Sequence, residues 1–142
     1  MDYRRLNQVS VSDAYPMPRV EDLIDCVGKS TYILTLELTQ GYWQVPVALK
    51  DLPKTAFTTP FGLYQFNTMP FRLKGAPATF QRLMDRAIHG LDFAAVYLDD
   101  LIIFSESWEK HLTHSQMVRE RLCQAALTAK ARKCEFGASK CV

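Results

Sequence analysis

Two adjacent acids, Asp99 and Asp100, constrain the fold of this chain more than any other feature of its sequence. They stand between two apolar runs, residues 93–98 (FAAVYL) and 101–104 (LIIF). Because two strand-like runs separated by a short polar break predict a hairpin, both acids fall at its tip. Like charges at an apolar tip repel and lose hydration, and a divalent cation is the simplest compensation. An ordinary surface turn, in which Asp is favoured, is the alternative.

A third acid, Glu37, ends another strand-like run. Residues 31–38 (TYILTLEL) alternate in the manner of a strand, and Glu37 lies on the face shared with Ile33 and Thr35. If this strand neighbours the hairpin, three carboxylates converge, and such hard oxygen ligands suit Mg²⁺ or Mn²⁺ rather than zinc. Two-metal phosphoryl transfer is the chemistry that uses this kind of cluster.

Three segments have the periodicity of amphipathic helices. Residues 18–28 place Cys26 within an apolar helix face, and residues 75–90 begin near Pro77 and end at Gly90. Ser107 is the expected N-cap of a helix that runs to about residue 129. The predicted buried side of this last helix consists of Trp108, Leu112, Val118, Leu122 and Ala125.

The middle helix has two distinct faces. Its apolar face consists of Phe80, Leu83, Met84, Ala87 and Ile88. Its opposite, polar face consists of Gln81, Arg82, Asp85 and Arg86. A second hairpin is predicted from residues 54–59 and 63–69, and residues 130–140 form a basic, extended end. This order of elements predicts an α+β domain, an antiparallel sheet with helices packed on one face and the other face open.

The composition sets wider limits. The chain has 142 residues, 48% of them hydrophobic, and a formal net charge of +2, which predicts one globular domain. No apolar run approaches the ~18 residues of a membrane span, and no signal peptide is visible. The four cysteines (Cys26, Cys123, Cys134 and Cys141) lack a CxxC pair and are expected to be free thiols in a reducing compartment. The small net charge neither supports nor excludes nucleic acid as a partner.

Successive motifs along the chain resemble those of a known family. They are residues 2–7 (DYRRLN), 36–44 (LELTQGYWQ), 54–57 (KTAF), 69–71 (MPF), 76–81 (APATFQ), 97–100 (YLDD) and 133–137 (KCEFG). In this order and at this spacing they resemble the reverse transcriptase of gypsy-like retrotransposons with long terminal repeats. The resemblance covers essentially the whole chain.

The resemblance implies a fold and an activity. The fold is a right-hand polymerase palm with part of the fingers and no thumb, spanning residues 1–142 as a single domain. The activity is RNA-directed DNA polymerisation, the transfer of a nucleotide from dNTP to a primer 3′-hydroxyl on an RNA or DNA template, with two Mg²⁺ or Mn²⁺ ions. The family's polyproteins also carry thumb and ribonuclease H domains, and the expected location is the cytoplasm or a retrotransposon particle.

The resemblance also implies site residues. Asp99 would bind both metals, Asp100 would complete the acidic tip, and Glu37 would occupy the position of the family's other metal-binding Asp. Tyr42 matches the aromatic gate that excludes a 2′-hydroxyl, with an ordinary core tyrosine as the alternative. Phe71, Arg72 and Gln81 fall in segments that line the nucleotide and template pocket. Arg4 lies in the fingers block, where an exposed arginine without a specific contact is the alternative.

The sequence departs from the family pattern in three ways. Glu37 stands where the family has Asp, and the added methylene moves the carboxylate by about 1 Å, a misplacement that can cost ~10²-fold in rate. Arg72 stands where the family usually has Gly, which is damaging if that backbone needs positive φ, and a productive phosphate contact from Arg72 is the alternative. The chain is also expected to be truncated at both ends.

Two function classes remain open on these grounds. One is a polymerase domain, and the other is a non-catalytic retrotransposon remnant that retains the palm fold with weak nucleic-acid or metal binding. A generic metal-binding module of cellular origin would require all the ordered motifs to be coincidental.

Overall fold

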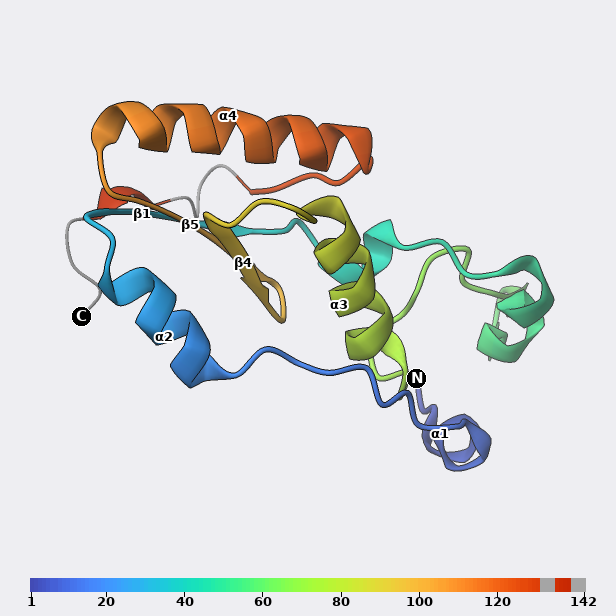
Figure 1. The fold of residues 1–142 in the computed structure, drawn as a ribbon. Coiled ribbons are helices and arrows are strands. Elements are labelled where there is room, and N and C mark those ends of the chain that lie inside the picture. The colour runs from blue at the N-terminus through green and yellow to red at the C-terminus, as the bar shows by residue number, and fades with distance from the viewer. Residues whose placement is uncertain (131–134, 139–142) are drawn as a thin grey trace.

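The computed structural model describes residues 1–130 and 135–138 (Figure 1). Its helices and strands follow the order expected for an α+β domain, with three additions that were not predicted, namely α1 and two 3₁₀ helices between β1 and β2. The elements are α1 (Arg4–Val9), α2 (Val20–Gly28), β1 (Tyr32–Glu37), η1 (Gly41–Gln44), η2 (Leu49–Thr55), β2 (Phe57–Thr59), β3 (Gly62–Tyr64), α3 (Ala76–Ala87), β4 (Ala94–Tyr97), β5 (Asp100–Ser105), α4 (Trp108–Gln124) and β6 (Glu135–Ala138).

The main sheet has the strand order β4-β5-β1-β6, and its three strand pairs are antiparallel. The strands β4 and β5 form the predicted hairpin around the two acids. Strand β1 pairs along the whole of β5, so that Glu37 lies opposite Asp100 at one end and Tyr32 opposite Ser105 at the other. The pairing of β1 with β5 therefore confirms that the strand carrying Glu37 neighbours the hairpin of the two acids.

Helices α3 and α4 cover one face of the sheet and form the core with it. Alternation along the strands directs Leu34, Leu101 and Ile103 to this face, where all three are buried. They pack in one cluster with Phe80 and Met84 of α3 and with side chains of α4. Truncation of one of these buried side chains to alanine is expected to cost about 2–5 kcal/mol.

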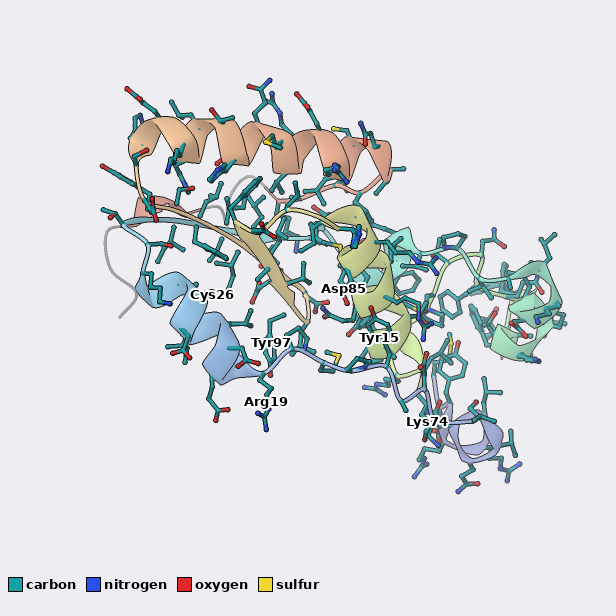
Figure 2. The ribbon with its side chains drawn as sticks, in the orientation of Figure 1. Tyr15, Arg19, Cys26, Lys74, Asp85 and Tyr97 are labelled. Carbon is teal, nitrogen blue, oxygen red and sulfur yellow. The ribbon has the colours of Figure 1, made fainter. Side chains whose placement is uncertain are left out.

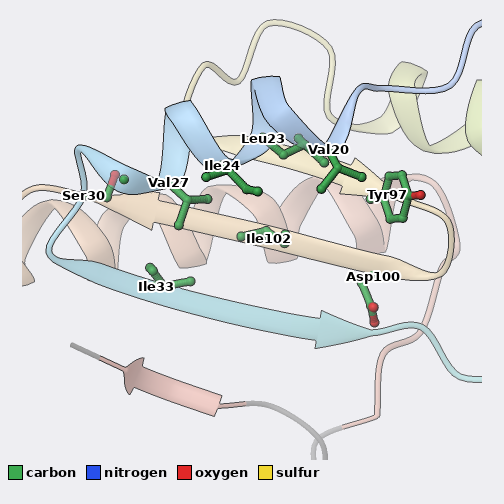
Figure 3. Close-up of a pocket in the computed structure, with 10 residues that line it drawn as sticks. Val20, Leu23, Ile24, Val27, Ser30, Ile33, Tyr97, Asp100 and Ile102 are labelled. Atoms are coloured by element: carbon green, nitrogen blue, oxygen red, sulfur yellow. The ribbon is translucent and has the colours of Figure 1, made fainter. Parts of the chain in front are cut away.

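The opposite face of the sheet, which was expected to be open, carries α2, and this helix lies along it without burying any of its own residues (Figures 1 and 3). A groove of about 580 Å³ separates the helix from the strands, and Leu23, Val27 and Ile102 contribute to its lining. Cys26 is exposed, so its expected position within an apolar helix face is wrong (Figure 2). Other residues of α2, among them Leu23 and Val27, form the apolar side of the helix that faces the sheet.

Helix α3 confirms the predicted helix but corrects its polar face. Gln81 was expected on the polar face with Arg82, and it is fully buried instead. Its side-chain amide donates a hydrogen bond to the carbonyl oxygen of Val96 in β4 at 3.3 Å. Helical periodicity alone does not reveal this burial, because it depends on the strand that packs beside the helix.

Helix α4 begins as predicted and ends earlier. The Ser107 hydroxyl accepts a hydrogen bond from the Lys110 backbone N–H, which confirms the N-cap. The helix ends at Gln124 rather than near residue 129, because Ala126 adopts a φ of 55° and the N–H of Leu127 turns back to the carbonyl of Leu122. This is the arrangement that glycine usually supplies after a helix, and no glycine marks it here.

The predicted buried side of α4 is partly wrong. Val118 and Leu122 are buried, but Trp108 and Leu112 are 46% and 54% exposed. His111 is buried in their place. The first turn of α4 places His111 against the sheet and leaves Trp108 at its side, where the indole packs on the ring of Tyr32 with centroids 5.6 Å apart.

The remaining expectations are met in part. The second hairpin forms, but its strands are shorter than predicted, and residues 54 and 55 belong to η2. Within the basic end, residues 135–138 form β6 beside β1. Cys134 and Cys141 lie outside the described residues. Among the residues described, no helix is long and apolar enough to cross a membrane.

Two histidines of α4 share one serine hydroxyl of β5. The Ser105 Oγ lies 2.7 Å from His114 Nδ1 and 3.1 Å from His111 Nδ1. Burial lowers the pKa of both imidazoles, and His114 also stacks on Phe93 with ring centroids 3.8 Å apart. The fold therefore favours both rings in the neutral form.

We expect the protein to lose stability as the pH falls below about 6.5, the ordinary pKa of histidine. Below that pH the unfolded chain takes up protons that the folded histidines resist, so the free energy of unfolding decreases until the lowered pKa values are passed. Thermal melts of the wild type and His114→Gln at pH 7.5 and 5.5 test this. The variant is expected to lose less stability over this interval, and equal losses would contradict the role of the pair.

Candidate active site at the acidic turn

The two acids of the hairpin lie at a turn that is fixed to the end of β1. Leu98 and Asp99 form the turn between β4 and β5, and Leu98 has a φ of 55°, a left-handed conformation that is unusual for a bulky residue. The carbonyl of Asp99 accepts a hydrogen bond from the backbone N–H of Leu38 at 3.3 Å. The strand that carries Glu37 thus also holds the acidic turn.

Asp99 has a carboxylate in an unfavourable environment. Its Oδ1 atom is buried and finds no hydrogen-bond partner among the described residues. Burial raises the pKa of Asp99, and the negative charges of Asp100 and Glu37 raise it further. A desolvated carboxylate next to two other acids is destabilised unless a positive charge approaches it. This carboxylate is therefore a candidate ligand for a cation.

Glu37 lies at the same sheet edge and has a cationic neighbour. Its Oε1 atom is 3.5 Å from Lys130 Nζ, and its backbone carbonyl accepts a hydrogen bond from the Lys130 N–H at 2.9 Å. No sequence motif marks this lysine as a site residue, and its only signal is the positive charge of the segment that begins at residue 130. The contact joins residues that are far apart in the sequence, so only the fold reveals it.

The three acids are neighbours, but their side chains do not form a ready ligand set. Within residues 1–130 and 135–138, no group of three acidic, histidine or cysteine side chains is arranged to hold a metal ion. The donor chemistry nevertheless fits Mg²⁺ or Mn²⁺, because all three side chains offer carboxylate oxygens. The partnerless oxygen of Asp99 is the atom that such an ion would satisfy.

Tyr42 stands beside the acidic turn in a setting of aromatic rings. It lies in η1 with its ring edge-on to Phe80 and Phe71, at centroid distances of 5.4 and 5.6 Å. Partial burial raises the pKa of the Tyr42 hydroxyl, and the charge of Asp99 raises it further. The preceding Gly41 is needed for this packing, because a Cβ atom there would lie 2.7 Å from Phe80 Cζ.

The other predicted nucleotide-binding residues are separated by the fold. Phe71 is half-exposed and joins the aromatic group of Tyr42, whereas Gln81 is buried beneath β4 and does not share their surface. Arg72 is exposed. Arg4 is also exposed, and its guanidinium forms an ion pair with Asp2.

The backbone at Arg72 has the positive φ at which glycine would be favoured. Its φ is 72°, in the left-handed region that favours glycine. Asn7 of α1 supports this loop, because its side-chain amide donates to the Arg72 carbonyl and its Oδ1 accepts from the Lys74 N–H. The arginine is therefore a strained residue in a loop that α1 holds in place.

We expect Arg72→Gly to raise the free energy of unfolding by about 1 kcal/mol, because left-handed backbone costs an L residue ~1–2 kcal/mol and glycine's extra entropy in the unfolded chain offsets part of that gain. Urea denaturation measures the change. Arg72→Ala is the matched control, since it removes the guanidinium and keeps the strain, and it should give no gain. A gain of equal size in both variants would show that charge rather than backbone strain is responsible.

Known proteins with a similar sequence place the chain in one family. A family model described as "Reverse transcriptase (RNA-dependent DNA polymerase)" matches residues 1–142. The retrovirus-related Pol polyprotein from transposon 297 of Drosophila melanogaster is 41% identical over 138 residues, which are 96% of this chain and 13% of that polyprotein. An RNA-directed DNA polymerase homolog of Oenothera berteroana is 45% identical over 125 residues, 84% of this chain and 88% of that protein.

Solved structures agree with this placement. The prototype foamy virus protease-reverse transcriptase is 25% identical, with a TM-score of 0.84 over 96% of this chain and 18% of the viral chain. A foamy viral protease-reverse transcriptase in complex with double-stranded DNA has a TM-score of 0.91 at 21% identity, over 99% of this chain and 25% of the viral chain, which shows the shared fold. The chain spans about an eighth of the transposon 297 polyprotein. It belongs to the reverse transcriptase family, and its relatives include the Pol polyproteins of retrotransposons.

Proposed function

We propose that this chain supplies the palm and part of the fingers of an RNA-directed DNA polymerase, with Asp99 at the centre of its active site. The observation that carries the proposal is the buried Asp99 oxygen without a described partner, at a turn it shares with Asp100 and opposite the end of β1 that carries Glu37. Destabilised acids of this kind are concentrated at functional sites, where a bound cation can offset their cost.

Glu37, Asp99 and Asp100 would hold two Mg²⁺ or Mn²⁺ ions. When bound, such ions favour the ionised primer 3′-hydroxyl and stabilise charge on the leaving pyrophosphate. Asp99 and Asp100 contribute the carboxylates of the turn, and Leu38 holds the turn through the Asp99 carbonyl. Glu37 contributes its carboxylate from β1, where Lys130 is its competing cation.

The proposed substrates are dNTP and a template-primer duplex of RNA or DNA. One foamy viral relative was solved in complex with an RNA/DNA hybrid and another in complex with double-stranded DNA. In this chain, the ring of Tyr42, oriented by Phe71 and Phe80, would lie beneath the sugar of the incoming nucleotide and exclude a 2′-hydroxyl. The remaining contacts to primer and triphosphate would come from the thumb, the rest of the fingers and the ribonuclease H domain of a longer cytoplasmic polyprotein.

A non-catalytic remnant is the second candidate function, and two observations favour it. Glu37 is longer than the family's Asp and lies against Lys130. Arg72 has strained backbone at a position where the family usually has glycine. Such a remnant would retain the fold and the acidic turn, with weak metal or nucleic-acid binding.

We expect Mn²⁺ to bind at the acidic turn. In a titration followed by nuclear magnetic resonance, the amides of residues 97–100 should broaden strongly, because the paramagnetic ion lies next to them. Asp99→Asn should remove most of this broadening. Asp25→Asn, a change of the same type on exposed α2, should leave it intact. Broadening at the turn that survives in Asp99→Asn would overturn the metal site.

We expect Glu37 and Arg72 to limit catalysis. In a chimera that joins this chain to the other parts of the transposon 297 polyprotein, Glu37→Asp with Arg72→Gly should raise primer extension on RNA by ~10²-fold, because the carboxylate returns to its position. Single-nucleotide extension in Mg²⁺ measures this, with Asp99→Asn as the inactive control. Equal rates before and after repair would show that both residues are tolerated. Extension absent even after repair would favour the remnant.

In the repaired chimera, Tyr42→Ala should relax the choice between dNTP and rNTP without abolishing extension. The physical reason is that the ring would no longer fill the space that a 2′-hydroxyl needs. The ratio of extension rates with dNTP and rNTP measures the effect, and Tyr64→Phe, on the exposed strand β3, is the control. A ratio unchanged by Tyr42→Ala would assign Tyr42 to the core alone.

A further inference from the structure

Strand β4 is an edge strand, and its outer side needs hydrogen-bond donors. It ends the order β4-β5-β1-β6, so that only its inner side pairs with another strand. An unpaired carbonyl at a buried edge is costly unless a side chain donates to it. The carbonyl of Val96 receives such a bond, from Gln81 Nε2 of α3 at 3.3 Å. Val96 precedes Asp99 by only three positions in the chain.

The amide of Gln81 has one orientation that fits. Its Nε2 donates to Val96 O and, at 3.0 Å, to Asp85 Oδ1, which uses both of its N–H groups. Its Oε1 is buried without a described partner. A flipped amide would turn this oxygen toward two acceptors, so Asp85 and Val96 together exclude the flip. Asp85 thereby fixes the amide orientation in which Gln81 Nε2 donates to β4.

Asp85 is held in turn by the segment between α1 and α2. The hydroxyl of Tyr15 donates to Asp85 Oδ2 at 2.7 Å (Figure 2). Arg82 strengthens the attachment, because its guanidinium lies 4.8 Å from the centre of the Tyr15 ring and pairs with Asp13 at 2.6 Å. A continuous chain of hydrogen bonds thus runs from Tyr15 through Asp85 and Gln81 to the edge of β4.

We infer that Tyr15 and Asp85 are positioning residues for the acidic turn: they fix Gln81 against β4 and so hold the strand that leads into Asp99. The turn needs such support because Leu98 has a left-handed backbone, a conformation that persists only where its surroundings enforce it. The part of this inference that concerns metal binding rests on the proposed function. The part that concerns the position of the turn does not.

A merely structural role for the chain of hydrogen bonds would give a different result. If Gln81 only satisfies a buried carbonyl, its loss should loosen the protein as a whole. If Gln81 positions the turn, its loss should speed amide exchange first where the turn meets the end of β1. The N–H of Leu38, which donates to the Asp99 carbonyl, reports on that contact. The N–H of Thr31, which donates to the Ser105 carbonyl, reports on the opposite end of the β1–β5 pair, away from the turn.

The test measures amide hydrogen exchange and Mn²⁺ affinity in matched variants of the full chain. Asp85→Leu removes both bonds of the carboxylate, and Asp85→Asn can keep both, with the amide donating to the Tyr15 oxygen. Tyr15→Phe deletes only the outer bond and leaves a ring for Arg82. Tyr64→Phe, which removes a hydroxyl on β3, is the control for Tyr15→Phe.

We expect Asp85→Leu to speed exchange at Leu38 about tenfold and to weaken Mn²⁺ binding about tenfold, since a lost bond of this kind is worth roughly that factor. Exchange at Thr31 should not change. Asp85→Asn should restore both readouts to within about twofold of the wild type. Tyr15→Phe should give a smaller change in the same direction, and Tyr64→Phe none.

Each of the other outcomes would overturn either the positioning role or the proposed metal site. Unchanged exchange at Leu38 in Asp85→Leu, or equal acceleration at Leu38 and Thr31, would overturn the positioning role. Failure of Asp85→Asn to restore exchange at Leu38 would overturn it as well. If Asp85→Leu does not fold, Tyr15→Phe carries the same comparison. A wild type that binds no Mn²⁺ would overturn the proposed metal site, while exchange at Leu38 would still decide the positioning role.

Discussion

The antiparallel pairing of β1 with β5 is the interaction on which the rest of the structure depends. Its register places Glu37 opposite Asp100 and joins the end of β1 to the turn that carries Asp99. The same register directs Leu34 and Ile103 to the face covered by α3 and α4. A shift of one residue would reverse both faces, removing the core and the acidic site together. The core and the proposed active site therefore depend on the same register.

The candidate site and the loop of Arg72 lower the stability of the fold locally, and burial in the core compensates for this loss. Asp99 has a raised pKa, and Leu98 and Arg72 have left-handed backbone. Conformational strain of this kind costs of order 1–3 kcal/mol per residue, and it persists where the surrounding structure enforces it. Here the enforcing contacts come from other elements, namely the N–H of Leu38 at the turn and Asn7 at the loop of Arg72. Truncation of one core side chain costs a similar or larger amount.

Much of this architecture could be predicted from the sequence, because alternation and capping are local signals. They placed β1, the β4–β5 hairpin, α3 and the start of α4. The failures have non-local causes. Gln81 is buried because an edge strand needs a donor, Lys130 reaches Glu37 only through the fold, and Ala126 ends α4 without the usual glycine. The motifs along the whole chain indicated the family, whereas the side-chain contacts around Asp99 could be found only from the structure.

The pKa of Asp99 is the quantity that tests this account most directly. A ¹³C nuclear magnetic resonance titration of its side-chain carboxyl should give a pKa above the ordinary value for Asp, because burial and two neighbouring acids disfavour the charge. Addition of Mg²⁺ should lower that pKa, because the cation favours the ionised form. An ordinary pKa that does not respond to Mg²⁺ would contradict the assignment of Asp99 as the centre of a metal-dependent site.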